Sequence, residues 1–204
     1  MLWRAWRSDM RLAFKAIIAA VILVLSLAVP MLAGPFEDAV LAHDKGDYAT
    51  ALRLFRPLAN QGNADAQSIL GWMYAGGKGV PQDHAEGVKW YRLAANQGHV
   101  GAQFNLGVTY GGHGVTQDYV EAAKWYRLAA NQGHATAQIF LGVMYDLGNG
   151  VPQDIVSAHM WFNLSAAQGV ESAADMRKNL ERRMTPAQIA EAQKMAREWK
   201  PTKP

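Results

Sequence analysis

WYRLAANQGH occupies residues 90–99, and the same ten letters return at residues 125–134. Related wording stands at 54–63 (LFRPLANQGN) and at 161–170 (WFNLSAAQGV), so successive copies start 36, 35 and 36 residues apart. A fixed period of this length is typical of stacked helical repeats, in which each unit buries its apolar face against its neighbours. The sequence therefore predicts an all-α solenoid.

Three full units follow when the chain is aligned on this phrase: residues 60–95, 96–130 and 131–166. The same residue types recur at the same places in all three. The matched sets are Ala66, Ala102 and Ala137; Gln67, Gln103 and Gln138; Leu70, Leu106 and Leu141; Gly71, Gly107 and Gly142; Tyr74, Tyr110 and Tyr145; Asp83, Asp118 and Asp154; and Trp90, Trp125 and Trp161. Agreement at this many positions indicates one supersecondary unit that is repeated.

Each unit is predicted to contain two helices. The first should run from about Ala64 to Tyr74, because its recurring positions fall on one helical face. Gly71 lies inside that helix, where glycine costs about 1 kcal/mol relative to alanine, so we expect a close packing contact there. The second helix should start at Asp83, which has the spacing of a capping box with Glu86. The recurring tryptophans of the second helices are expected in the core.

A glycine-rich loop separates the two helices of each unit, at residues 75–82, 111–117 and 146–153. No loop contains GxxxxGK[ST] or follows a predicted strand, so a phosphate-binding loop is not indicated. Glycine instead allows the positive φ angles that a tight turn between helices needs.

The two flanks are predicted to close the solenoid. Residues 34–59 should form a shorter helical pair, and residues 167–204 capping helices with a short tail. Residues 185–188 have the pattern of a helix start, with a cap, a proline at the first helical position and a glutamine at the third. A solenoid needs such atypical ends to cover its last apolar face.

Residues 1–33 have the features of a cleavable export signal. Four basic residues and one acidic residue surround the start, and the uncharged run 16–29 follows. As a helix this run would span about 21 Å, less than the roughly 30 Å of a bilayer core. Cleavage after Ala33 is favoured, with cleavage after Ala28 or an uncleaved membrane anchor as alternatives. The predicted location is the bacterial periplasm; a membrane-anchored or secreted protein is the alternative.

The charge balance changes when this leader is removed. The full chain carries 20 Lys and Arg against 17 Asp and Glu. Without the 4 basic residues and 1 acidic residue of the leader, 16 of each remain, so nucleic acid is not indicated as a partner. The chain has no cysteine, and it therefore lacks disulfides, a thiolate nucleophile and a cysteine-based zinc site.

The pattern A-x-A-Q-x-x-L-G-x-x-Y, a glycine loop, G-V-x-Q-D and A-x-x-W-Y-x-x-A-A-x-Q-G is closely reproduced at 64–98 and 100–133. At 135–169 it recurs with Phe162 in place of tyrosine. These residues resemble Sel1-like repeats, a branch of the tetratricopeptide-type helical repeats. The resemblance covers roughly residues 44–170. It implies a right-handed superhelix of antiparallel helix pairs, and a non-enzymatic adaptor that binds proteins or peptides in the cell envelope.

A cysteine-rich branch of that family is reported to bind or hydrolyse β-lactams, which makes an envelope hydrolase or β-lactam-binding protein the alternative. The absence of cysteine argues against it, and no S-x-x-K, G-x-S-x-G or H-E-x-x-H occurs. His99 and His134 recur one repeat apart, about 10 Å at the usual helix spacing, which is too far for one metal ion. We therefore predict no cofactor, no metal and polar turn roles for both histidines.

Positions where the repeats differ are the candidates for specificity. On the first helix of each unit they step by three and four residues, so each set lines one face. The predicted partner-binding strip comprises Asp65, Ser68, Trp72, Phe104, Val108, Thr136, Ile139 and Val143. In such superhelices the first helices line the concave surface, where apolar anchors would bind a peptide or a partner helix. The alternative is that these side chains complete the packing between repeats.

Overall fold

The computed structural model describes residues 34–202, which form ten α-helices and no β-strand. The helices are α2 (Pro35–Asp44), α3 (Tyr48–Asn60), α4 (Ala64–Gly76), α5 (His84–Asn96), α6 (Val100–Tyr110), α7 (Tyr119–Asn131), α8 (Ala135–Leu147), α9 (Ile155–Ala167), α10 (Glu171–Glu181) and α11 (Pro186–Glu198). The predicted leader and its cleavage sites lie outside the described residues. Within the described part, no helix has the length and apolarity needed to cross a bilayer.

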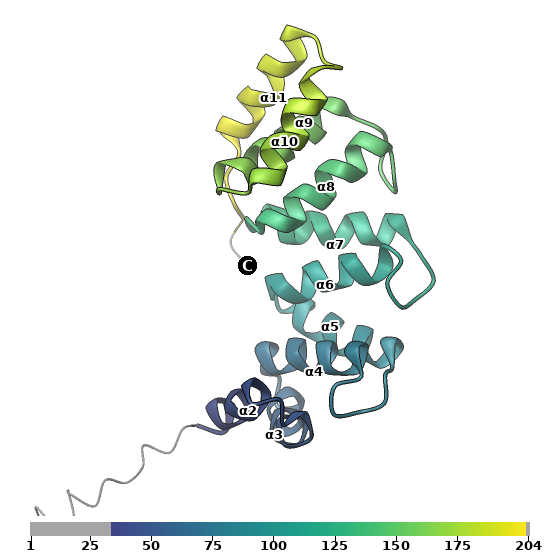
Figure 1. Cartoon of the computed structure of the whole chain (residues 1–204), viewed down its shortest axis with the longest axis vertical. Helices are drawn as coiled ribbons and strands as arrows, with labels where there is room; N and C mark the ends of the chain where they lie inside the picture. The colour runs from purple at the N-terminus through teal and green to yellow at the C-terminus, as the bar shows by residue number, and fades with distance from the viewer. Residues whose placement is uncertain (1–33, 203–204) are drawn as a thin grey trace, which may run out of the picture.

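The helices stack in one column, with α2 and α3 at one end and α10 and α11 at the other (Figure 1). From α2 to α10 each helix packs on the next, and α11 packs back on α9. We call α4, α6 and α8 the first helices, and α5, α7 and α9 the second helices. The predicted all-α solenoid is therefore confirmed.

The glycines inside the first helices lie directly against aromatic rings of the second helices. A Cβ atom on Gly71 would stand 2.5 Å from the ring of Tyr91, well inside van der Waals contact. The equivalent pairs are Gly107 with Tyr126, also at 2.5 Å, and Gly142 with Phe162, at 2.7 Å. The expected close contact is thus present in every unit. Trp125 and Trp161 are buried as expected, whereas Trp90 is half-buried.

A ladder of glutamine side chains connects successive helix ends. In the middle unit, Gln132 Nε2 donates to Gln103 Oε1 (2.8 Å), and Gln103 Nε2 donates to the Ala95 carbonyl (3.2 Å). The same ladder runs through Gln97, Gln67 and Ala59 and through Gln168, Gln138 and Ala130. The glutamine of the recurring corner therefore ties the end of α5, α7 or α9, through a first helix, to the end of α3, α5 or α7, respectively.

The arginine of the recurring phrase bridges to the following unit. Arg92 donates to the Tyr110 hydroxyl at 2.7 Å, which links α5 to α6. The equivalent pairs are Arg56 with Tyr74 (2.6 Å) and Arg127 with Tyr145 (3.0 Å). These exposed bonds add orientation more than stability, because water competes for both partners.

At the start of α5, only one of the two hydrogen bonds of the predicted capping box is present. Asp83 accepts the Glu86 backbone N–H at 2.9 Å, as expected. The reciprocal bond is missing, because the Asp83 N–H already donates to the Tyr74 carbonyl at 2.9 Å. Glu86 pairs instead with Lys89 at 2.7 Å. The prediction of a full capping box was therefore wrong at this helix.

The corners between units are closed by glycine and a side-chain cap. Gly98 has φ +87°, a conformation that side chains other than glycine rarely adopt. The following His99 caps α6, since its Nδ1 accepts the Ala102 N–H at 3.0 Å. His134 caps α8 in the same way, and the polar turn roles predicted for both histidines are confirmed. The glycine loops also contain positive φ angles, as expected.

The C-terminal end of the described chain packs back on the column. Thr185 and Gln188 form a reciprocal capping box at the start of α11. The side chain of Trp199, directly after α11, meets Trp161 of α9 edge-on, with ring centroids 6.3 Å apart. Beyond it the chain is extended, and the Thr202 N–H donates to the Asn131 carbonyl at the end of α7 (2.8 Å).

Candidate functional site

The predicted strip on the first helices is only partly exposed. Asp65, Trp72 and Thr136 are exposed, and Trp72 retains 38% of its surface. Ser68 is buried, with 9% exposure, which differs from the expectation that it lies off the packed face. The remaining members are half-buried: Phe104, Val108, Ile139 and Val143.

The aromatic members of the strip pack against neighbouring units. Trp72 meets the His43 ring edge-on, with centroids 5.2 Å apart, and lies 5.9 Å from Tyr48. Phe104 stacks on His134 at 4.6 Å. These contacts show that the strip helps to join the repeats, while the exposed part of Trp72 remains accessible.

Phe140 is an exposed aromatic residue that the sequence interpretation missed. It stacks on Tyr126, with centroids 5.1 Å apart, yet 41% of its surface stays exposed. Its equivalents are Ile69 and Asn105, so the variation between units was visible in the sequence. The predicted strip follows the positions of Asp65, Ser68 and Trp72 in each unit, and Phe140 lies at the position of Ile69, one residue after that of Ser68. We call the exposed surface of α4, α6 and α8, with Trp72 and Phe140, the first-helix face.

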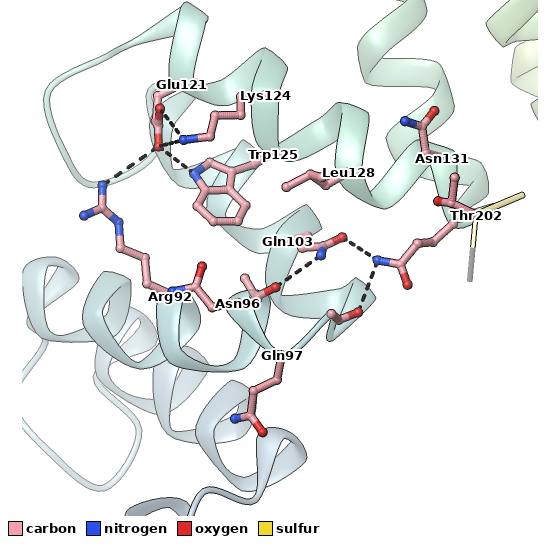
Figure 2. A pocket seen from close by; sticks show the side chains of 13 residues that line it. Arg92, Asn96, Gln97, Gln103, Glu121, Lys124, Trp125, Leu128, Asn131 and Thr202 are labelled. Atoms are coloured by element: carbon pink, nitrogen blue, oxygen red, sulfur yellow. Dashed lines mark hydrogen bonds and ion pairs between the residues drawn. The ribbon is translucent and has the colours of Figure 1, made fainter. Parts of the chain in front are cut away.

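A second candidate site is a groove between α5 and α7, with a volume of about 860 Å³ (Figure 2). This α5/α7 groove is built by α5, α7 and the corner between α5 and α6, with Gln103 of α6 and Thr202 of the C-terminal segment at its edges. None of these side chains belongs to the predicted strip. Its lining includes Arg92, Asn96, Gln103, Glu121, Lys124, Trp125, Leu128, Asn131 and Thr202. Sequence reasoning missed it, although five of these residues belong to the two copies of the recurring phrase: Arg92 and Asn96 to the first, and Trp125, Leu128 and Asn131 to the second.

The charges of the α5/α7 groove centre on Glu121. Its Oε1 accepts from the Trp125 indole N–H at 3.0 Å and lies 3.4 Å from Lys124 Nζ. Arg92 approaches the same oxygen at 4.0 Å, as Figure 2 shows. Two cations thus face one carboxylate, which leaves the groove with a positive excess. Leu128, 40% exposed, supplies its apolar wall.

The ionisable groups near both surfaces do not gather as a metal site. Within residues 34–202, no three His, Asp or Glu side chains lie together as ligands would. His99 Nε2 lies 3.1 Å from Asp65, and His134 stands against Phe104. Burial lowers the pKa of His134 below its ordinary value of 6.5, which keeps the ring neutral and Nδ1 free to accept the cap hydrogen bond.

Antiparallel helix pairs stacked through identical corners define an α-solenoid repeat protein. The Sel1 repeat model matches residues 42–63, 64–99, 100–134 and 135–170, which together make up more than half of the chain. The chain therefore belongs to the Sel1 repeat family, as the sequence motifs indicated. Each of the last three matched repeats begins with a first helix, four residues after the start of the corresponding unit defined above at residues 60, 96 and 131. Proteins built from this repeat generally act as scaffolds for protein interaction.

Two solved structures are similar over most of the solenoid. A Sel1 repeat protein from Oxalobacter formigenes shares 34% identity over 68% of this chain, with a TM-score of 0.63. A protective antigen present in uropathogenic Escherichia coli strains, displaying an SLR fold, shares 31% identity over 73%, with a TM-score of 0.55. The chain spans 56% and 40% of the lengths of these two proteins. No curated protein matches the chain significantly.

Proposed function

We propose that this protein is a non-enzymatic scaffold of the cell envelope that binds a partner polypeptide on the first-helix face. The carrying observation is that Trp72 and Phe140, two large aromatic side chains, keep 38% and 41% of their surface exposed. Both are held by rings of the same chain, so little side-chain entropy is lost when a partner covers them. Aromatic anchors of this kind dominate the energetics of protein interfaces.

The rest of the strip supports a recognition role by position. Asp65 and Thr136 are exposed polar side chains on α4 and α8, and they would form the rim around the aromatic anchors. The half-buried apolar residues between them supply a continuous base. A partner helix or an extended peptide laid across α4, α6 and α8 would contact both anchors.

The envelope location rests on the leader. Its basic start, short uncharged run and small-residue exit are the features of an export signal. Expression of the full chain in a bacterial host, followed by cell fractionation and intact-mass measurement, tests this part. A periplasmic protein that has lost residues 1–33 or 1–28 is the expected result, and a cytoplasmic protein of full mass would contradict it.

The scaffold role is tested by crosslinking the tagged full chain in its own cells and identifying the captured proteins by mass spectrometry. The informative variant is Trp72→Ala combined with Phe140→Ala, which removes both anchors and leaves α4 and α8 helical. We expect recovery of the partner to fall at least about tenfold, because each buried aromatic contributes roughly a tenfold factor or more.

Leu41→Ala combined with Leu93→Ala is the matched control. Both leucines are also exposed, at 52% and 48%, but they lie on α2 and α5, outside the first-helix face. Recovery should stay near that of the unaltered chain. Equal losses in the two double variants would show that the first-helix face is not the binding surface.

A further inference from the structure

The surface of α9, one repeat further along than α7, is covered by the chain itself. Met195, Ala196 and Trp199 pack on the core cluster that contains Trp161 and Leu164 of α9. The Trp199 ring meets the Trp161 ring edge-on. The C-terminal segment then leaves the helix at Trp199, which has an extended backbone, and continues as non-helical chain to Thr202. An aromatic anchor followed by extended chain is therefore what this surface of a second helix accepts.

The extended part is held by a backbone hydrogen bond at the corner of the repeat. The Thr202 N–H donates to the Asn131 carbonyl, which is the last residue of α7 and has no further helical donor. Helix ends leave such carbonyl groups without intrahelical partners, so they bind a passing N–H group regardless of its side chain.

The α5/α7 groove repeats these features, and no helix of residues 34–202 covers it as α11 covers α9. Trp125 and Leu128 stand where α9 has Trp161 and Leu164, and Asn96 ends α5 as Asn131 ends α7. Leu128 is 40% exposed, whereas Leu164 is half-buried beneath α11. Among residues 34–202, no N–H group donates to the Asn96 carbonyl. Thr202 reaches only the rim of this groove, beside Asn131 (Figure 2).

The charged side chains of the α5/α7 groove differ from the side chains at the equivalent positions of α9. Lys124 and Arg92 face Glu121 here, whereas Met160 and Ser157 replace Lys124 and Glu121 on α9. The Lys124 ammonium lies over the Trp125 indole, 5.4 Å from the ring centre, so an entering ring would pack chiefly on Leu128. The positive excess favours an occupant that carries a carboxylate next to its aromatic residue.

We propose that the α5/α7 groove is a second binding site, distinct from the first-helix face, and that it takes an extended acidic peptide with one aromatic anchor. The aromatic ring packs on Leu128 beside Trp125. A carboxylate of the peptide pairs with Lys124 and Arg92. A peptide N–H downstream of the ring donates to the Asn96 carbonyl, as Thr202 does to Asn131.

Fluorescence anisotropy with three labelled peptides tests the site on protein purified from cells that express the full chain. The first peptide copies residues 195–202, the second has glutamate in place of its arginine and lysine, and the third is the second with alanine in place of tryptophan. We expect the acidic tryptophan peptide to bind most tightly. The alanine peptide should bind at least about tenfold more weakly, since the anchor is lost.

Leu128→Glu is the informative variant, and Leu93→Glu is its matched control. Both leucines occupy the same repeat position on an exposed helix surface, at 40% and 48%, but only Leu128 lines the groove. We expect Leu128→Glu to weaken binding by about tenfold or more and Leu93→Glu by less than about twofold. Lys124→Gln should reduce the preference for the acidic peptide over the first peptide.

Three results would overturn the proposal: no saturable binding of the acidic peptide, equal losses in Leu128→Glu and Leu93→Glu, or equal affinity for the tryptophan and alanine peptides. The variant Trp72→Ala with Phe140→Ala separates this site from the proposed function. It should leave peptide binding unchanged, because neither residue lines the groove. If that variant abolished peptide binding, the peptide would be using the first-helix face.

Discussion

The ring of Tyr126 lies so close to Gly107 that a Cβ atom on the glycine would stand 2.5 Å from ring carbon Cδ1. Gly107→Ala must therefore push α6 and α7 apart, because the ring is itself buried and cannot turn away. We expect a net loss of about 1–3 kcal/mol in the free energy of unfolding, after a gain of up to about 1 kcal/mol in helix propensity. Urea unfolding followed by circular dichroism measures it.

Gly76→Ala is the control for that experiment. Gly76 ends α4, and a Cβ atom there would meet only the Lys78 side chain, at an ordinary 3.5 Å. Its stability should equal or slightly exceed that of the unaltered chain. A Gly107→Ala protein as stable as Gly76→Ala would contradict the close-packing explanation.

The glutamine ladder predicts an unusually large effect for a polar substitution. Gln103→Ala removes two hydrogen bonds at a buried corner, one to the Ala95 carbonyl and one from the Gln132 amide. The Ala95 carbonyl keeps the Gly98 N–H, and the Gln132 amide keeps the Gly98 carbonyl. We expect the free energy of unfolding to fall by about 1–3 kcal/mol, because two buried hydrogen bonds are lost.

The comparison is Gln117→Ala, which removes an exposed side-chain bond to the Gly111 carbonyl (2.9 Å). Water replaces that bond, so the expected loss is below about 1 kcal/mol. If both variants lose the same amount in urea unfolding, the ladder contributes no more than an ordinary surface hydrogen bond.

Stability should depend on pH through His134. Its pKa in the folded chain is lowered from 6.5 by burial, so protonation favours the unfolded chain. The stabilisation is fully present above about pH 6.5 and is lost as the pH falls toward the folded-state pKa. Protonation also places a hydrogen on Nδ1, which then cannot accept the Ala137 N–H. His134→Asn keeps a good cap, as Asn63 does at α4, without a titratable ring.

We therefore expect His134→Asn to lose less stability than the unaltered chain between about pH 7.5 and about pH 5. Thermal unfolding at several pH values provides the measurement. Parallel pH profiles for the two proteins would show that the His134 ring does not titrate with unfolding in this range.

Removing the side chain at the third helical position should destabilise α11 more than α5. Gln188→Ala breaks a reciprocal capping box, since the Gln188 Oε1 accepts the Thr185 N–H at 2.9 Å. It should cost about 1 kcal/mol. Glu86→Ala should cost less than about 0.5 kcal/mol, because it removes only an exposed pair with Lys89. Hydrogen exchange of the amides in α11 and α5 reports each effect locally, and a larger loss at α5 would contradict the half-formed box.

Much of the fold could be predicted because the repeats carry their own local signals. Gly71 and its equivalents marked the close contacts, and Thr185 marked the start of the last helix. The half-formed box at Asp83 could not be predicted, since the competing acceptor is the Tyr74 carbonyl on another helix. The exposure of Phe140 and the burial of Ser68 also depend on which neighbouring rings and helices cover each position.

The sequence by itself determined the period, the helix pairs, the corners and the family, because each is encoded by short patterns of apolar, glycine and capping residues that act within one unit. Only the tertiary structure decided which surfaces remain open. Trp199 covers α9 and Thr202 binds Asn131, while Leu128 in the α5/α7 groove stays 40% exposed among the described residues. The physical reason is that exposure depends on contacts between residues far apart in the chain, and a repeated local pattern does not carry that information.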